Sequence, residues 1–305
     1  MRHAVYGLLH LPDATLLDVA NLLTPNSSER DRLCQRIAAC VDNEFSRRFF
    51  EHDLRKYGKD DLAPPQHKLS KLLLTDPLSL VLSQPEDRFD FRRIMDAGGQ
   101  IFIANLASVG PVRDLLGCLL IALLHLAAIS RSDTPVNRRI PFHLYIDEAH
   151  RFLRGGIEDL FVEMRKFQVS ATVAHHYMSQ FDSDQADGLR QAGTTIVFNE
   201  PEDEARLLVR SLGGQVRVED LTTLEIGEAV VRVGTQVARI RTPRPRPIPA
   251  NSHRDRIVEL SRQRCYKTRQ EIEAFVRGRG ARGSRRALTP AVETAENESY
   301  EYDVL

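Results

Sequence analysis

Apolar residues recur at helical spacing along the first part of the chain. Between residues 5 and 57 no alternating strand pattern interrupts them, and the Asn-Ser-Ser-Glu cluster at 26–29 is typical of a helix start. A polar, proline-containing stretch at 59–65 is expected to break the helices, and helical spacing resumes at 67–82. The pattern therefore predicts an N-terminal helical domain over residues 1–90.

From about residue 100, short apolar runs alternate with helical patterns. Strands are expected at 100–106, 142–147, 169–173 and 194–198, and helices at 112–130, 157–167 and 203–212. Continuous apolar strands that alternate with helices are typical of a parallel sheet covered on both faces. The chain is therefore expected to adopt an α/β fold with a mainly parallel sheet over residues 91–245.

The last part of the chain changes character three times. Residues 228–240 alternate between apolar and polar types and turn near Gly234, which predicts a C-terminal β-hairpin. A proline-rich connector and exposed helices are expected over 246–277. The Arg/Gly-rich and then acidic residues 278–305 predict a disordered tail, for which a solvated role is favoured over nucleic-acid contact.

Composition narrows the choice of function only slightly. The formal net charge is zero, so no global field recruits nucleic acid or an anionic membrane, and only local patches could do so. The four cysteines are too scattered for a metal knuckle or a disulfide framework and indicate reduced thiols, hence a cytoplasmic location. The apolar run at 115–129 is shorter than the roughly 20 residues of a membrane span and contains His125, so a buried helix is expected and no intrinsic span.

The strongest chemical signal is an apolar strand that ends in two adjacent carboxylates, Asp147 and Glu148. Many P-loop ATPases place such a pair at a strand end, where the first carboxylate orients Mg²⁺ and the second polarises the attacking water. An acidic pair can also simply cap the next helix. The companion phosphate loop, Gly-x4-Gly-Lys-Ser/Thr, is absent from the 305 residues, where Gly58-Lys59 is followed by Asp60.

The tetrapeptide Asp-Glu-Ala-His at 147–150 is also the signature of the DEAH helicases, and Ser-Ala-Thr at 170–172 copies their downstream triplet. Those helicases have a second ATPase-like domain that contributes arginines. The stretch after residue 172 ends in a connector and a tail and is too short for such a domain. A free-standing helicase is therefore disfavoured.

A series of motifs covers far more of the chain, from about residue 10 to about residue 275. They are Lys-Leu-Ser-Lys-Leu-Leu-Leu (68–74), Gln-Ile-Phe-Ile-Ala-Asn-Leu (100–106), Tyr-Ile-Asp-Glu-Ala-His-Arg-Phe (145–152), Met-Arg-Lys-Phe-Gln-Val-Ser (164–170), Ala-His-His-Tyr-Met-Ser-Gln-Phe (174–181), Gly-Thr-Thr-Ile-Val-Phe (193–198) and Ser-Arg-Gln-Arg-Cys-Tyr (261–266). In order and spacing this series resembles the C-terminal part of the HerA/FtsK superfamily of P-loop ATPases. It is similar in particular to the conjugative coupling proteins related to TraG and TraD and to type IV secretion.

This resemblance implies a RecA-like domain that binds ATP and Mg²⁺ between the subunits of a hexameric ring and moves DNA through its pore. A relaxase or a secretion channel would be the further partner. Asp147 would orient the metal, and Glu148 would be the general base. His150 and Arg151 are expected simply to begin the next helix.

Two departures from the family count against an active motor. The phosphate loop would lie upstream of residue 1, so the sequence is expected to be the downstream portion of a longer polypeptide or of a split gene. His176 stands where the family usually has a glutamine that senses the γ-phosphate. Gln180, one helical turn further on, is a candidate substitute, and Arg190 is a candidate arginine finger for a neighbouring subunit.

Two functions follow from these observations. The leading expectation is the C-terminal part of an ATP-driven DNA translocase that is not ATP-competent alone. The alternative is a non-catalytic nucleic-acid-binding or assembly subunit that retains a degenerate RecA-like fold. ATP turnover by the chain would exclude the alternative, and nucleic-acid binding without hydrolysis would support it.

Overall fold

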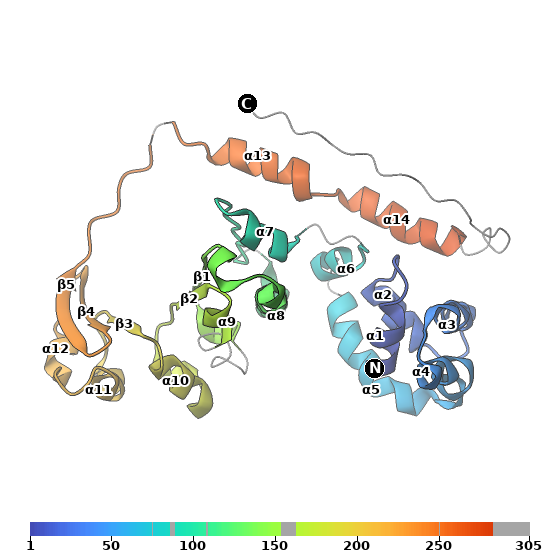
Figure 1. The fold of residues 1–305 in the computed structure, drawn as a ribbon, viewed down its shortest axis with the longest axis horizontal. Helices are drawn as coiled ribbons and strands as arrows, with labels where there is room; N and C mark the ends of the chain where they lie inside the picture. The colour runs from blue at the N-terminus through green and yellow to red at the C-terminus, as the bar shows by residue number, and fades with distance from the viewer. Residues whose placement is uncertain (75, 86–88, 108, 154–162, 250, 283–305) are drawn as a thin grey trace. The chain divides into compact units, whose positions relative to one another are not determined.

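A computed structural model of the chain describes residues 1–74, 76–85, 89–107, 109–153, 163–249 and 251–282 (Figure 1). The contacts divide the chain into two compact units, residues 1–85 with 266–305 and residues 86–265. Each unit is described by itself. The finer domain bounds expected from the sequence stay a prediction.

The described part of the first unit is helical. Its elements are α1 (Arg2–Leu8), α2 (Leu16–Leu22), α3 (Ser28–Cys40), α4 (Glu44–Arg48), a π-helical turn η1 (Phe49–Asp53), a 3₁₀ turn η2 (Leu54–Lys56), α5 (Lys59–Leu73), α6 (Asp76–Leu82) and α14 (Arg269–Arg282). Ser27 caps α3 by accepting the Glu29 N–H at 3.3 Å, as the polar cluster predicted. Leu22, Ile37 and Phe50 are completely buried in the core of this unit.

The expected break at 59–65 is wrong, because α5 runs through Pro64 and Pro65. Each proline removes one backbone donor from the helix. Leu62 and Leu69 on the same helix are both buried in the core, and this burial outweighs the local preference for a break. At the start of α5 the Asp61 carboxylate accepts the Gly58 N–H at 2.9 Å.

The second unit mixes helices and strands. Its elements are α7 (Phe91–Ala97), η3 (Gly110–Val112), α8 (Arg113–Ser130), η4 (Arg131–Asp133), η5 (Val136–Arg138), β1 (Phe142–Ile146), η6 (Ala149–Arg151), α9 (Met164–Lys166), β2 (Val169–Val173), η8 (Met178–Gln180), α10 (Ser183–Arg190), β3 (Thr194–Val197), α11 (Glu202–Ser211), α12 (Val218–Thr222), β4 (Glu228–Val233), β5 (Gln236–Arg241) and α13 (Arg254–Cys265).

The described strands form two sheets. β1 and β2 run parallel with Phe142 opposite Val169 and Ile146 opposite Val173, whereas β3, β4 and β5 form an antiparallel sheet in that order. The α/β fold with a parallel sheet is confirmed, and so is the hairpin that turns at Gly234. The expectation that 194–198 extends the parallel sheet is wrong. In the described chain β3 pairs with the nearby hairpin, where the Gly234 N–H donates to the Gly193 carbonyl at 3.0 Å.

The expected strand at 100–106 is also absent from the described sheets. Ile101 and Ile103 are 87% and 81% exposed, whereas Phe102 packs on the core. The centroids of the Phe102 and Phe91 rings are 5.1 Å apart. The segment alternates like a strand, but no described strand provides hydrogen bonds to it. The local pattern therefore predicted correctly that side chains alternate between core and solvent, and predicted wrongly that the segment pairs with another strand.

Helix α8 is confirmed, but its predicted burial is only partly correct. Gly117, Leu124 and Ala128 are buried, whereas Leu123 and Leu126 are 46% and 64% exposed. One apolar face packs on the core, because a single helix stripe suffices for that contact. Among the described residues, this is the one helix whose length and composition would suit a membrane span, and core helices of soluble proteins pass the same test.

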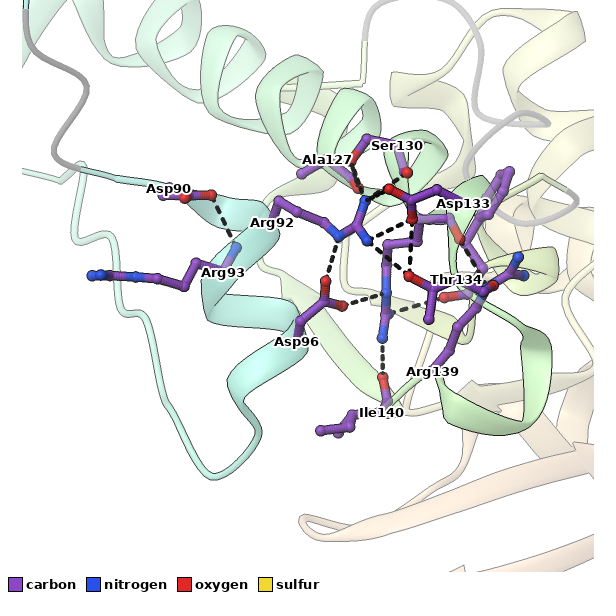
Figure 2. A network of polar contacts seen from close by, with 12 residues as sticks. Asp90, Arg92, Arg93, Asp96, Ala127, Ser130, Asp133, Thr134, Arg139 and Ile140 are labelled. Carbon is purple, nitrogen blue, oxygen red and sulfur yellow. Dashed lines mark hydrogen bonds and ion pairs between the residues drawn. The ribbon is translucent and has the colours of Figure 1, made fainter. Parts of the chain in front are cut away.

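A polar network connects α7, the end of α8 and the entry into β1 (Figure 2). Arg131 is completely buried, donates to the carbonyls of Ile140 at 2.7 Å and Phe167 at 3.0 Å, and forms an ion pair with Asp96 at 3.0 Å. Arg92 forms ion pairs with Asp96 and with Asp133. Through Ile140, the network contacts the chain two residues before β1 begins.

The remaining predictions fall on the C-terminal segments. The helices expected before residue 277 are present as α13, which is exposed, and α14, in which Ile272 is buried. Residues 278–282 continue α14, so the expected tail begins too early. The rest of that tail, 283–305, lies outside the described residues, as does most of the helix expected at 157–167.

Candidate functional site

The acidic pair lies at the carboxyl end of β1, as the sequence predicted. Ile146 is buried, Asp147 is exposed, and Glu148 takes a left-handed backbone conformation with φ 51° and ψ 44°. The Asp147 Oδ1 accepts the Glu148 N–H at 3.0 Å. Positive φ is uncommon for residues other than glycine and marks a site where the surrounding structure imposes the conformation.

Two backbone hydrogen bonds impose that conformation. The Ala174 N–H donates to the Ile146 carbonyl at 2.8 Å, and the Ala149 N–H donates to the Ala174 carbonyl at 2.9 Å. Ala149 itself is completely buried. The chain after β2 is therefore tied to both sides of Asp147–Glu148, and the residues that follow Ala174 are brought beside Glu148.

The Glu148 carboxylate is faced by two imidazoles. His176 Nε2 lies 2.8 Å from one carboxylate oxygen, and His150 Nδ1 lies 3.6 Å from the other. The Glu148 side chain is 35% exposed, which leaves it reachable from solvent. Sequence reasoning treated His176 as a departure and His150 as a helix start, and missed both as partners of Glu148. Their position just after each of two paired parallel strands was the available signal.

A second set of titratable groups consists of His175, Glu200 and Glu204, and the first two interact electrostatically with His176. Burial lowers the pKa of His175, with Glu204 opposing the shift. Burial also raises the pKa of Glu200 to about 7, assisted by Glu204 and opposed by His176. Glu204 in turn accepts the Met178 N–H at 2.9 Å and so holds the turn η8 that follows the histidines.

The other two predicted site residues contact different partners. Gln180 is exposed, and its Oε1 accepts the Tyr177 N–H at 3.1 Å within the turn η8. Arg190 forms an ion pair with Asp187 on α10. No described contact joins either residue to Asp147 or Glu148, and their roles as a phosphate sensor and an arginine finger stay predictions.

The chemistry available at this site is that of two adjacent carboxylates with two imidazoles beside one of them. Glu148 can accept a proton from water, and His176 and His150 can stabilise its charge when they are protonated. Asp147 is an exposed carboxylate of the kind that provides one oxygen ligand to Mg²⁺ when phosphates provide others. Among the described residues no cluster of three or more metal-ligating side chains is present, so the donors fit Mg²⁺ only together with a bound nucleotide.

A parallel strand pair that ends in an acidic dipeptide, together with helices and an antiparallel hairpin, defines an α/β architecture. Solved structures with a similar fold include those of a conjugative coupling protein. The unbound form of the bacterial coupling protein TrwBΔN70 is 15% identical with a TM-score of 0.57, over 80% of this chain and 62% of that one.

The same fold similarity holds for two nucleotide-bound structures. TrwB in complex with the ATP analogue ADPNP and TrwB with ADP and Mg²⁺ each give 14% identity and a TM-score of 0.56, over 80% of this chain and 63% of theirs. The chain thus spans less than two thirds of the length of these structures. No protein-family model and no curated protein matches the sequence. At this identity the likeness establishes the fold.

Proposed function

We propose that this chain has a conjugation-related, ATPase-like role. The observation that carries the proposal is the Asp147–Glu148 pair, which directly follows the parallel strand β1. It occurs on a fold shared with TrwB, a coupling protein whose structures contain ADPNP or ADP and Mg²⁺. The acidic pair is placed where an α/β ATPase organises metal and water.

Each site residue has a separate task in this proposal. Asp147 would contribute one carboxylate oxygen to Mg²⁺, which would neutralise phosphate charge when bound with ATP. Glu148 orients water and accepts its proton. The His176 imidazole lies beside that carboxylate, with its Nε2 2.8 Å from one carboxylate oxygen.

The chain is proposed to need a phosphate loop from outside its 305 residues, because the sequence contains no Gly-x4-Gly-Lys-Ser/Thr. The complete machine would be a cytoplasmic hexameric ring that translocates DNA and meets a relaxase or a secretion channel. Gln180 and Arg190 remain the proposed sensor and arginine finger of that assembly.

ATP hydrolysis by the purified chain tests the proposal, first alone and then with a polypeptide encoded immediately upstream. We expect no turnover alone, and turnover in the mixture that Glu148→Gln lowers by about 100-fold or more because a positioned general base is lost. Glu259→Gln, an exposed carboxylate on α13, is the matched control and should leave the rate unchanged. Turnover in the mixture that Glu148→Gln does not affect would contradict the assignment.

A second candidate is a non-catalytic nucleic-acid-binding or assembly subunit. The ion-pair distance between His176 and Glu148 favours it, because a partner on this carboxylate competes with water for the same oxygen. In that case single-stranded DNA would bind with a steep salt dependence, and neither upstream polypeptide nor Mg²⁺ would produce hydrolysis.

A further inference from the structure

A cavity of about 680 Å³ lies in the second unit, away from the acidic pair in sequence and formed by the end of α10, by α11 and by β4. Four of the six residues that line it are arginines. The lining residues are Arg190, Arg206, Leu207, Arg210, Ser211 and Arg232.

Two of these arginines have no acidic partner among the residues that the structure describes. Arg232 donates to the Ala192 carbonyl at 2.9 Å, the Gly234 carbonyl at 3.0 Å and the Thr195 hydroxyl at 3.0 Å, all of which are uncharged. Its Nε is buried without a hydrogen-bond partner. Arg210 forms no ion pair with any described residue. Both positive charges are therefore uncompensated, and Arg232 is held rigidly by the β3–β4 sheet.

The other two arginines have acidic partners that are exposed and on their own helices. Arg190 pairs with Asp187 on α10, and Arg206 pairs with Glu202 on α11. Asp203 and Glu219 also act on Arg206 from nearby positions. None of these carboxylates lines the cavity. Because exposed pairs of this kind are weak, a stronger anion can displace them from the guanidinium groups.

We propose that this cavity is a binding site for a phosphate-bearing anion. Guanidinium groups bind phosphate oxygens through paired N–H donors, and several of them around one concave surface favour a ligand with more than one phosphate. The Ser211 side chain at the wall adds a hydroxyl donor. The site includes neither Asp147 nor Glu148, and it gives a chain of zero net charge a local positive patch.

The test uses the full chain without ATP or Mg²⁺. Tripolyphosphate binding is measured by calorimetry, and binding of a fluorescein-labelled single-stranded DNA is measured by anisotropy at several salt concentrations. Arg210→Glu should weaken binding by about tenfold or more, because it replaces an unpaired donor with a repelling charge. The matched control is Arg93→Glu, an exposed arginine on α7 whose side chain points away from the polar network (Figure 2).

Loss of binding in Arg210→Glu but not in Arg93→Glu supports the site. The double variant with Arg206→Gln and Arg210→Gln should lose less affinity for the probes than Arg210→Glu if the cavity wall, rather than the fold, is affected. If tripolyphosphate displaces the DNA, the phosphate groups themselves are the ligand. If the DNA binds and tripolyphosphate does not, the ligand is a nucleic-acid backbone. Absence of binding to both probes, or equal affinity in Arg210→Glu and the unmodified chain, would overturn the proposal. Glu148→Gln should leave this affinity unchanged, which separates the result from that of the hydrolysis assay.

Discussion

The pKa of the half-buried carboxyl of Glu200 depends on its surroundings. Its pKa is raised from 4.5 to about 7, first by burial, then by the Glu204 charge, with His176 opposing. A carboxyl with a raised pKa in the folded state stabilises the fold below pH 4.5, and this contribution is lost as the pH rises through about 7.

Glu200→Gln tests this directly, because the amide cannot ionise. Such a shift corresponds to about 3 kcal/mol for complete burial, and solvent screening reduces it to about 1–2 kcal/mol here. We expect the variant to be more stable than the unmodified chain by that amount at pH 8 and equally stable at pH 4.5. Urea unfolding at both pH values provides the measurement. Glu219→Gln, an exposed carboxyl on α12, should show no such difference between the two pH values.

The residue scale also contains a backbone conformation that the sequence did not indicate. Glu148 has positive φ, which costs an ordinary residue about 1–2 kcal/mol. The cost is offset because the turn buries Ala149 and places the carboxylate beside His176. The strain therefore lies at the residue proposed as the general base, where pre-positioning matters most.

Among the elements, α8 and the turn η6 after the acidic pair are in unusually close contact. A Cβ atom on Gly117 would lie 2.2 Å from a ring carbon of Phe152, and the Cys118 thiol contacts the Phe152 carbonyl at 3.3 Å. Glycine at this position lets the helix approach the turn. The position of Asp147 and Glu148 thus depends on a helix nearly thirty residues earlier in the chain.

Gly117→Ala should therefore destabilise the chain, although alanine is the better helix former by about 1 kcal/mol. The steric overlap exceeds that gain, and we expect a net loss of about 1–2 kcal/mol in the free energy of unfolding. Phe152→Leu in the same chain should restore part of it. Gly193→Ala is the control, since nothing lies within 4 Å of its added methyl group. The free energy of unfolding is measured by chemical denaturation. An unchanged value in Gly117→Ala would show that α8 can move without cost.

For the whole molecule, the important feature is that each unit has a hydrophobic core of its own. Phe50 is completely buried in the core of residues 1–85, and Arg131 is completely buried in the polar network of residues 86–265. A substitution at either position should therefore destabilise its own unit and leave the other unit unchanged.

Hydrogen exchange resolved by peptide tests this expectation. Phe50→Leu should cost about 1–2 kcal/mol and speed exchange in α2 and α3 while leaving β1 and β2 unchanged. Arg131→Met should cost about 2–4 kcal/mol, because it leaves the carbonyls of Ile140 and Phe167 without their donor and removes one of the two ion-pair partners of Asp96, and it should speed exchange in β1 and β2 alone. Exchange that rises throughout the chain in either variant would contradict the assignment of separate cores.

Sequence by itself determined the features that depend on neighbouring residues. The helical spacing of residues 5–57, the hairpin at Gly234 and the apolar strand that ends at Asp147 follow from local periodicity and turn chemistry. Local rules were wrong at α5, where core burial of Leu62 and Leu69 overrides two prolines, and at 100–106, where no described strand provides the partner.

Only the tertiary structure decided which distant residues meet. The contact of His176 with Glu148 arises because β1 and β2 pair in parallel with their carboxyl ends together, and no property of either segment alone specifies that register. The arginine-lined cavity likewise joins α10, α11 and β4, which are far apart in the sequence. Long-range contacts of this kind depend on the summed packing of the chain, whereas helix and turn signals are read within a few residues.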